Sequence, residues 1–368
     1  MAAYGGDTRV KKLEGGREMV GVLYESGEWS DFKLACELEA ALAECDEGGA
    51  ERAQKSFAAA SDDGAGAVAK GGVVLVNMVA EDCIERALQC DLLVSRVFAS
   101  APFRNHAKAH ANMEKLVEAL RGTDIRMINA PRAHFFEIDK RRAAWAMAQG
   151  GVLVPRVFAC GAPQKLAELA SEWEYPCIVK PNCGGRSTCT AIVHDKNEAY
   201  AFLATLACAA AAEGECFAVF PRSLDKGGSL SSEKVSEMDF IVEEYLRPKS
   251  GFLTRLELVN GELLFAVKRS VAENGLSSYH FGSTYEMYPD CPSAVVAMVE
   301  HAAALLAIRY GSFDVIECER GAFVIDANSV SNVSEDCTEM FGIDLMHEYA
   351  RSIVACKQYS ILGERCDE

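Results

Sequence analysis

The sequence predicts an α/β protein with a parallel sheet near its N-terminus and antiparallel sheets after it. In the first 128 residues, short apolar runs alternate with helix-like segments, an order typical of parallel sheets. Further along, Asn260-Gly261 and Glu319-Arg320-Gly321 each separate two runs rich in β-branched and aromatic residues, which is the pattern of a β-hairpin. Because half of the 368 residues are apolar, the chain can bury the cores of two or three packed lobes.

The net charge of −17 limits the classes of partner. No sustained run of Lys and Arg occurs, so we expect no binding to nucleic acid or to an anionic membrane. The longest nearly uncharged apolar stretches, 199–212 and 302–308, are too short to cross a bilayer, and the polar first 17 residues do not resemble a signal peptide. We therefore expect a cytoplasmic protein; whether it forms a homo-oligomer stays open. Fifteen cysteines without a Cys-x-x-Cys pair favour reduced thiols over zinc or disulfides.

Residues 17–128 read as an N-terminal βα domain that follows a disordered tail over 1–16. Apolar runs predict strands at 19–24, 73–78, 91–96 and 125–128. Helices are predicted at 31–45, with Ser30 as the cap, at 81–89, and in a segment ending at Leu120. Residues 46–72 are rich in Ala, Gly, Asp and Ser, which indicates a flexible surface insertion.

Residues 129–246 form the second predicted domain, built around a possible phosphate-binding flap. The expected elements are helices at 129–149, 164–172 and 197–212, strands at 177–180, 189–193, 217–220 and 239–246, and a surface loop at 223–237. Lys180 ends a strand, and Gly184 and Gly185 lie in the turn that follows it. Backbone N–H groups of such a turn and one ammonium group can cover phosphates. Lys-Pro after a strand is also a common way to leave a sheet, so the pattern alone is weak.

Residues 247–368 form the third predicted domain, which begins with a hairpin around Asn260-Gly261. Its strands, 254–259 and 263–269, carry Arg255 on one side and Lys268-Arg269 on the other. In an acidic protein, arginines converging from both strands can bind carboxylate or phosphate oxygens in bidentate fashion. A salt-bridged surface hairpin is the alternative.

The second hairpin, 313–318 with 322–327, carries candidate metal ligands. Closing its loop at Cys318 and Ala322 places Asp314 opposite Asp326, and Asn328 lies on the same face as Asp326. Carboxylates at a cross-strand separation of roughly 5 Å repel each other, so we expect a cation between them. Oxygen ligands without imidazole or thiolate suit magnesium, which also accepts water and nucleotide phosphates as ligands. A solvent-facing polar edge is the alternative.

Taken in order, these features resemble the ATP-grasp superfamily, most closely its amino-acid ligase branch that includes the ribosomal-protein glutamate ligases. The likeness runs from about Met19 to Cys356. It rests on 129–140, 150–155, 178–187, 242–246, Arg255, Lys268-Arg269, Asp314, Asp326, Asn328 and 341–345. The resemblance implies an ATP-grasp fold behind an N-terminal parallel-sheet domain. It also implies that a carboxylate attacks ATP to form an acyl-phosphate, from which an amine displaces phosphate.

The resemblance further implies roles for individual residues. Magnesium would be held, as two ions for which manganese can substitute, by Asp314, Asp326 and Asn328. Arg255 and Arg269 would be catalytic and would steady the acyl-phosphate. ATP would be bound by Lys140, Lys180, Gly184, Gly185, Ser187, Glu243, Glu244, Tyr245, Leu246, Ser277 and Ser278.

The expected activity is therefore that of an ATP-dependent carbon–nitrogen ligase acting on small-molecule or peptide carboxylates and amines. An ATP-grasp small-molecule kinase and a non-catalytic nucleotide-binding protein are the alternatives. The second alternative gains support because Phe252-Leu253 stands where the family usually has an acidic residue for the nucleotide ribose.

Overall fold

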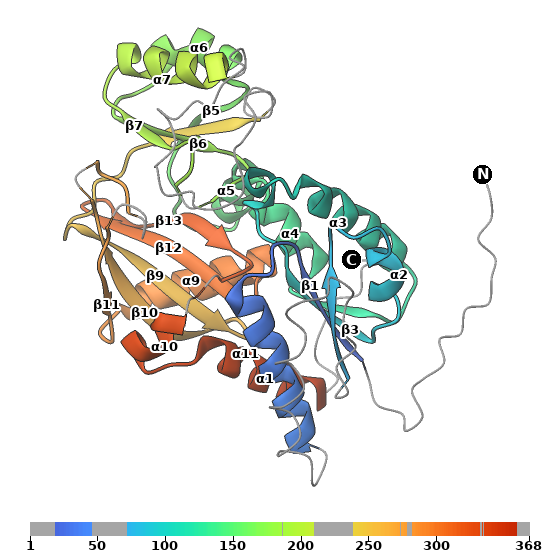
Figure 1. Ribbon diagram of the computed structural model, residues 1–368. Coiled ribbons are helices and arrows are strands. Elements are labelled where there is room, and N and C mark those ends of the chain that lie inside the picture. Colours follow the sequence, from blue (N-terminus) through green and yellow to red (C-terminus); the bar gives the residue numbers. More distant parts are fainter. Residues whose placement is uncertain are drawn as a thin grey trace.

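The computed structural model describes residues 19–45, 72–185, 187–209, 238–272, 274–277, 282–331, 333 and 335–358. The described chain forms three sheets with helices packed around them (Figure 1). The features expected at 1–16, 46–71, 217–220 and 223–237 lie outside the described residues.

The N-terminal sheet is parallel, as predicted, with strand order β2-β1-β3-β4. Its strands are β1 (Val20–Tyr24), β2 (Val73–Asn77), β3 (Leu92–Arg96) and β4 (Arg126–Ile128). Helix α1 (Trp29–Cys45) packs on one face of this sheet, and α2 (Cys83–Ala87) and α3 (Ala107–Leu120) pack on the other. Burial on both faces explains why the strands are nearly continuous apolar runs.

The start of α1 differs from the prediction, because the helix begins at Trp29 and Ser30 is not its cap. The Ser30 hydroxyl is buried and accepts a hydrogen bond from Arg96 at 2.6 Å. Asp31 instead accepts from the Glu28 N–H at 3.0 Å. The second Asp31 oxygen pairs with Arg96 at 3.0 Å, so this start of helix is fixed against β3.

The predicted helix at 129–149 is wrong as a single element. The structure has α4 (Pro131–Glu137) and then α5 (Lys140–Gln149). Asp139 separates them, because its side chain accepts from the Arg142 N–H at 3.0 Å and caps a new helix. As a result, Lys140 is the first residue of α5.

The second sheet is antiparallel, with strand order β5-β8-β6-β7. Its strands are β5 (Val157–Gly161), β6 (Cys177–Pro181), β7 (Ala191–Val193) and β8 (Phe240–Glu244). Helices α6 (Pro163–Leu169) and α7 (Lys196–Ala209) cover its outer face (Figure 1). Strand β7 begins later than predicted, since Cys189 has a left-handed φ of 51° and still belongs to the turn.

The third sheet has the order β11-β10-β9-β12-β13 and forms the base of a cavity. It contains β9 (Phe252–Val259), β10 (Glu262–Ser270), β11 (Tyr285–Met287), β12 (Gly311–Cys318) and β13 (Gly321–Asn328). Helix α9 (Ser293–Leu306) packs on its far face together with α5, and α10 (Glu335–Phe341) and α11 (Leu345–Gln358) follow β13. The predicted turn at Asn260-Gly261 is confirmed, with φ values of 53° and 84°.

The β12–β13 hairpin has a shorter loop than predicted, because Cys318 pairs with Gly321 and not with Ala322. That register alone would place Asp314 opposite Ile325. An irregularity in the ladder between Asp314 and Val315 leaves Ile325 as an extra residue in β13, so Asp314 does pair with Asp326. The expected pairing is present, although the predicted loop was wrong.

Gly311 offers a test of this hairpin, because a Cβ atom there would lie 2.1 Å from the Asn328 carbonyl oxygen and 2.9 Å from Ile308 Cγ2. We expect Gly311→Ala to lower the free energy of unfolding by about 1–3 kcal/mol, as overpacking usually does. Gly185→Ala is the matched control, since its Cβ would meet only Ser100 Cβ, at 3.8 Å. Urea unfolding of both variants measures the difference, and equal midpoints would contradict the close approach at Gly311.

Candidate functional site

A cavity of about 680 Å³ lies where the three sheets meet, a volume usual for ligand sites. Every site residue predicted from the sequence lines this cavity, except Ser278, which lies outside the described residues. The lining residues among them are Lys140, Lys180, Gly184, Gly185, Ser187, Glu243, Glu244, Tyr245, Leu246, Arg255, Arg269, Ser277, Asp314, Asp326 and Asn328. Residues from the second and third predicted domains therefore meet at one place.

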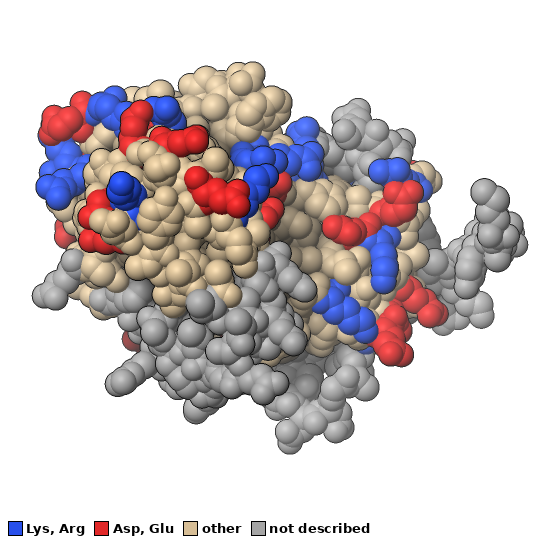
Figure 2. All heavy atoms as spheres, turned by 90° about the horizontal axis from the view of Figure 1, so that it is seen from above, with Lys and Arg blue, Asp and Glu red and all other residues tan. Residues whose placement is uncertain are grey.

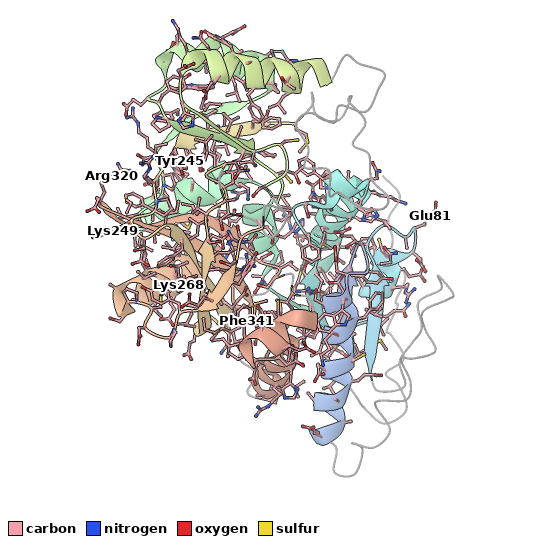
Figure 3. All side chains as sticks on the ribbon, turned by 60° about the vertical axis from the view of Figure 1, so that its left-hand side comes forward. Glu81, Tyr245, Lys249, Lys268, Arg320 and Phe341 are labelled. Atoms are coloured by element: carbon pink, nitrogen blue, oxygen red, sulfur yellow. The ribbon has the colours of Figure 1, made fainter. Side chains whose placement is uncertain are left out.

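The alternation of side chains along the strands decides which residues of β9 and β10 reach the cavity. Arg269 lines the cavity, whereas its neighbour Lys268 does not. The Lys268 ammonium lies over the rings of Phe252 and Tyr288, at 5.1 Å and 4.5 Å from their centroids. Figure 3 shows Lys268 on the third sheet, well below Tyr245, which lies near the second sheet. Of the predicted basic pair, only Arg269 belongs to the site.

Two arginines from adjacent strands converge on Asp314. Arg255 Nη1 lies 3.5 Å from Asp314 Oδ1, and Arg269 Nη2 donates to Asp314 Oδ2 at 3.0 Å. Arg255 Nε also donates to Glu257 Oε1 at 2.7 Å. Burial opposes the charge of Arg255, but Glu257 and Asp314 outweigh it and hold its pKa above the ordinary value. The sequence reasoning missed Glu257, although its spacing of two residues from Arg255 places both on one face of β9.

Two lysines approach β13 from other elements. Lys140 of α5 donates to Asp326 Oδ1 at 2.6 Å. Lys180 of β6 pairs with Glu243 Oε2 at 2.9 Å and donates to the Ile325 carbonyl at 3.0 Å. We call the six residues at the centre of the cavity the charged band: Lys140, Lys180, Arg255, Arg269, Asp314 and Asp326.

The Lys140–Asp326 pair makes a testable contribution to the pH dependence of stability. Burial disfavours both charges, but each partner outweighs it, so the pKa of Lys140 is raised and that of Asp326 is lowered. The stabilisation from Asp326 is present above its unfolded pKa of about 3.9 and is lost as the pH falls through its folded pKa. The stabilisation from Lys140 is present below about 10.4 and is lost as the pH rises through its folded pKa.

We therefore expect the stability difference between the wild type and the Lys140→Gln/Asp326→Asn double variant to stay constant from about pH 5 to pH 9. Below that range the difference should shrink. Urea unfolding at several pH values measures it, and a change of sign or a steep slope near neutral pH would show that another group controls the pair.

Hydrogen bonds of Ser277 and Tyr245 hold neighbouring groups in place at the edges of the site. Arg269 Nε donates to Ser277 Oγ at 3.1 Å, and that hydroxyl donates to the Ser270 carbonyl at 2.9 Å, which fixes the plane of the guanidinium group. The Tyr245 hydroxyl reaches the Gly275 carbonyl at 3.5 Å. Tyr245 thus connects the end of β8, in the second sheet, with the loop after β10, in the third sheet (Figure 3).

Glu244 lines the cavity, but its carboxylate binds groups at the rim. Oε1 accepts from the Arg156 N–H at 3.0 Å, and Oε2 pairs with the exposed Arg320 at 2.6 Å. Both oxygens of the Glu244 carboxylate therefore already have partners.

Glu137 is a buried cavity residue that the sequence reasoning missed. It accepts from the Ala99 N–H at 3.2 Å and from the Ser329 N–H at 2.9 Å, and it also contacts the Ser329 hydroxyl. Burial raises its pKa. The side chain joins the loop after β3 to the end of β13, and nothing in the local sequence of helix α4 marks it for that role.

The donor set of the β12–β13 hairpin fits a hard divalent cation. Asp314 and Asp326 face each other across the hairpin, and Asn328 lies two residues beyond Asp326 on β13, where its side-chain carbonyl oxygen could serve as a third oxygen ligand. Within the described part of the chain, no cluster of three or more His, Cys, Asp and Glu side chains is placed to hold a metal. Two carboxylates and one amide would therefore be a partial ligand set, which water and phosphate oxygens complete in magnesium sites.

The surface adds little to the choice of partners. Figure 2 shows Lys and Arg side chains interspersed with Asp and Glu on the face seen from above, so the described residues form no continuous basic surface there. No helix in the described part of the chain is long and apolar enough to cross a membrane.

Comparisons with known proteins identify the fold. The chain matches no family model and no curated protein. Among solved structures it is similar to D-cycloserine synthetase DcsG, at 14% identity and a TM-score of 0.59 over 92% of this chain and 99% of that one. It is also similar to a RimK-domain ATP-grasp protein from Sphaerobacter thermophilus DSM 20745, at 14% identity and a TM-score of 0.56 over 90% and 98% of the two chains. D-alanine–D-alanine ligase from Bacillus anthracis gives 15% identity and a TM-score of 0.55 over 94% and 100%.

Proposed function

Because the chain has the ATP-grasp fold, we propose that it is an ATP-dependent ligase that joins a carboxylate to an amine. The charged band carries this proposal. Four cations from α5, β6, β9 and β10 converge there near two facing carboxylates, inside a cavity large enough for substrates. Phosphoryl transfer is catalysed mainly by positioning and by neutralising charge, and such a band supplies both.

The nucleotide base would bind at one apolar end of the cavity. Leu246, Leu253 and Ile316 line the cavity there and belong to one buried cluster. Leu253 occupies the region where an acidic residue for the ribose was expected, so apolar contact with the base carries more of the binding. Lys180 and the turn at Gly184 and Gly185 would cover the phosphates from above, and Lys140 would meet them beside Asp326.

The reaction would proceed in two steps. An oxygen of the substrate carboxylate attacks the γ-phosphorus, and the bond between that phosphorus and ADP breaks. The amine nitrogen then attacks the carbonyl carbon of the acyl-phosphate, and phosphate leaves with the carboxylate oxygen. Arg255 and Arg269 would hold the phosphoryl oxygens through both steps, with Ser277 orienting Arg269.

Magnesium, or manganese in its place, would be held by Asp314, Asp326 and Asn328 and would neutralise charge on the phosphates. Solved structures of similar fold support magnesium and ATP as ligands. ATP-grasp ligase PsnB is described in a complex with magnesium and ADP, at 14% identity and a TM-score of 0.50. D-alanine–D-alanine ligase from Bacillus anthracis is described in a complex with ATP, at 13% identity and a TM-score of 0.52.

The proposal is tested by incubating the protein with ATP and magnesium and a panel of carboxylates and amines. We expect release of ADP and free phosphate in equal amounts, and only when both a carboxylate and an amine are present. Transfer of phosphate to a hydroxyl compound, without free phosphate, would assign a kinase instead. Nucleotide binding without turnover across the panel would assign a non-catalytic protein.

A further inference from the structure

The cavity continues past the charged band into a second apolar region. We call this region the acceptor end and define it by Trp29, Phe98, Phe265, Val333, Phe341 and Ile343, all of which line the cavity. They come from the start of α1, the loop after β3, strand β10 and the segment from 333 to 343. Phe341 of α10 packs against Phe265 with 5.8 Å between ring centroids, and Figure 3 shows it where α10 meets the sheet.

The acceptor end is separate from the apolar end assigned to the nucleotide base. On β9, Leu253, Arg255 and Glu257 line the cavity in succession, and Phe265 of β10 pairs with the segment at Glu257. Two residues of strand span roughly 7 Å, so Leu253 and Phe265 lie on opposite sides of Arg255. They also belong to different buried clusters. Arg255 thus lies between two apolar regions, one of which the base would leave free.

Among the described residues, no Lys or Arg lines the acceptor end; the Arg96 guanidinium lies behind it, 5.5 Å from the centroid of the Phe98 ring. The cavity-lining residues at 28–29, 98–100 and 330–345 include Glu28 and Asp344 but no Lys or Arg. Asp344 pairs with Lys33 at 2.9 Å. The nearby Arg96 is buried and bound to Asp31, Ser30 and the Ser331 carbonyl. A carboxylate on a substrate side chain would find no partner here, and an unpaired charge is costly to bury.

Resting on the ligase function proposed above, we infer that one substrate is an amino acid with a large apolar side chain, such as leucine or phenylalanine, held at the acceptor end. Acidic amino acids are excluded from this position. Burial of each extra methylene group in such a pocket raises kcat/KM by about tenfold or more, so leucine should exceed alanine clearly.

The test measures phosphate release with ATP, magnesium and alanine, leucine, phenylalanine, glutamate or lysine, each offered alone and in pairs. We expect pairs that contain leucine or phenylalanine to exceed pairs that contain only alanine by at least about tenfold in kcat/KM. Glutamate offered in place of leucine or phenylalanine should give no activity. Met340→Lys places a cation at the same wall; Met340 lines the cavity and is 54% exposed, so the fold tolerates the change. It should reduce the preference for leucine over glutamate, whereas Trp145→Ala, at a 66% exposed site outside the cavity, should not.

The outcomes separate this inference from the ligase proposal. Phosphate release that is fastest with glutamate would overturn the apolar acceptor end and leave the ligase function standing. If no pair releases phosphate, the ligase proposal fails. The acceptor end is then tested by the melting temperature of the protein with magnesium, ADP and each amino acid. A melting temperature raised by leucine or phenylalanine, but not by glutamate, would support the apolar end. No shift with any of them would overturn it.

Discussion

Replacing Asp326 with asparagine is expected to abolish magnesium-dependent ATP turnover while the protein stays folded. Asparagine has the same shape and still offers Lys140 an acceptor oxygen, so the contact of 2.6 Å can persist as a weaker hydrogen bond. What is lost is one negative charge opposite Asp314. The substitution relieves repulsion between two facing carboxylates but also takes the charged partner from Lys140, so we expect some loss of stability with the fold, and hence the circular dichroism spectrum, retained.

Two readouts check this expectation. Turnover is measured as phosphate release, and binding is measured as the rise in melting temperature that magnesium and ADP produce together over ADP alone. Asp290→Asn is the matched control, because Asp290 is exposed and does not line the cavity. Normal turnover and a normal magnesium-dependent shift in Asp326→Asn would show that the hairpin is not the metal site.

Arg269→Lys is expected to lower the maximal rate by about a hundred- to a thousandfold, the usual effect of losing one preorganised donor in a transition state. Arg269 uses Nη2 on Asp314 and Nε on Ser277 at the same time. Lysine keeps the charge but lacks the planar group that holds two oxygens in fixed directions. If the arginine stabilises charge that develops during phosphoryl transfer, the rate should fall far more than the affinity for ATP.

The control for this substitution is Arg309→Lys, since the Arg309 guanidinium binds Asn260 at the hairpin turn, outside the cavity. Both variants are compared at saturating ATP, together with their ATP affinities by calorimetry. A near-normal maximal rate with a raised requirement for one substrate would make Arg269 a binding residue, and the role assigned to the two arginines in the transfer step would then be wrong.

The elements with short-range patterns could be predicted from the sequence. The parallel sheet follows from apolar runs alternating with helices, and the turn at Asn260-Gly261 follows from a residue pair that tolerates positive φ. For the β12–β13 hairpin, counting residues outward from the predicted loop did not give the correct register. Its loop is shorter than the three residues assumed, and the extra residue Ile325 compensates, so Asp314 still pairs with Asp326. No residue pattern marks that irregularity.

The partners within the site could not be predicted, because they are set by tertiary contacts. Lys140 and Asp326 are 186 positions apart and come from a helix and a strand that pack together only in the folded chain. Reading 129–149 as one helix also hid the cap at Asp139, which sets where Lys140 starts α5. Strand alternation, by contrast, could have removed Lys268 from the site and added Glu257 to it.

Formation of an acyl-phosphate is tested most directly with a carboxylate substrate labelled with oxygen-18 in both carboxyl oxygens. If the carboxylate attacks the γ-phosphorus, one labelled oxygen leaves with the phosphate when the amine displaces it. Mass spectrometry of the released phosphate should then show one oxygen-18 atom per turnover, with ADP formed in equal amount. Unlabelled phosphate, with the amide still being formed, would contradict attack of the carboxylate on ATP and with it the mechanism assigned to the charged band.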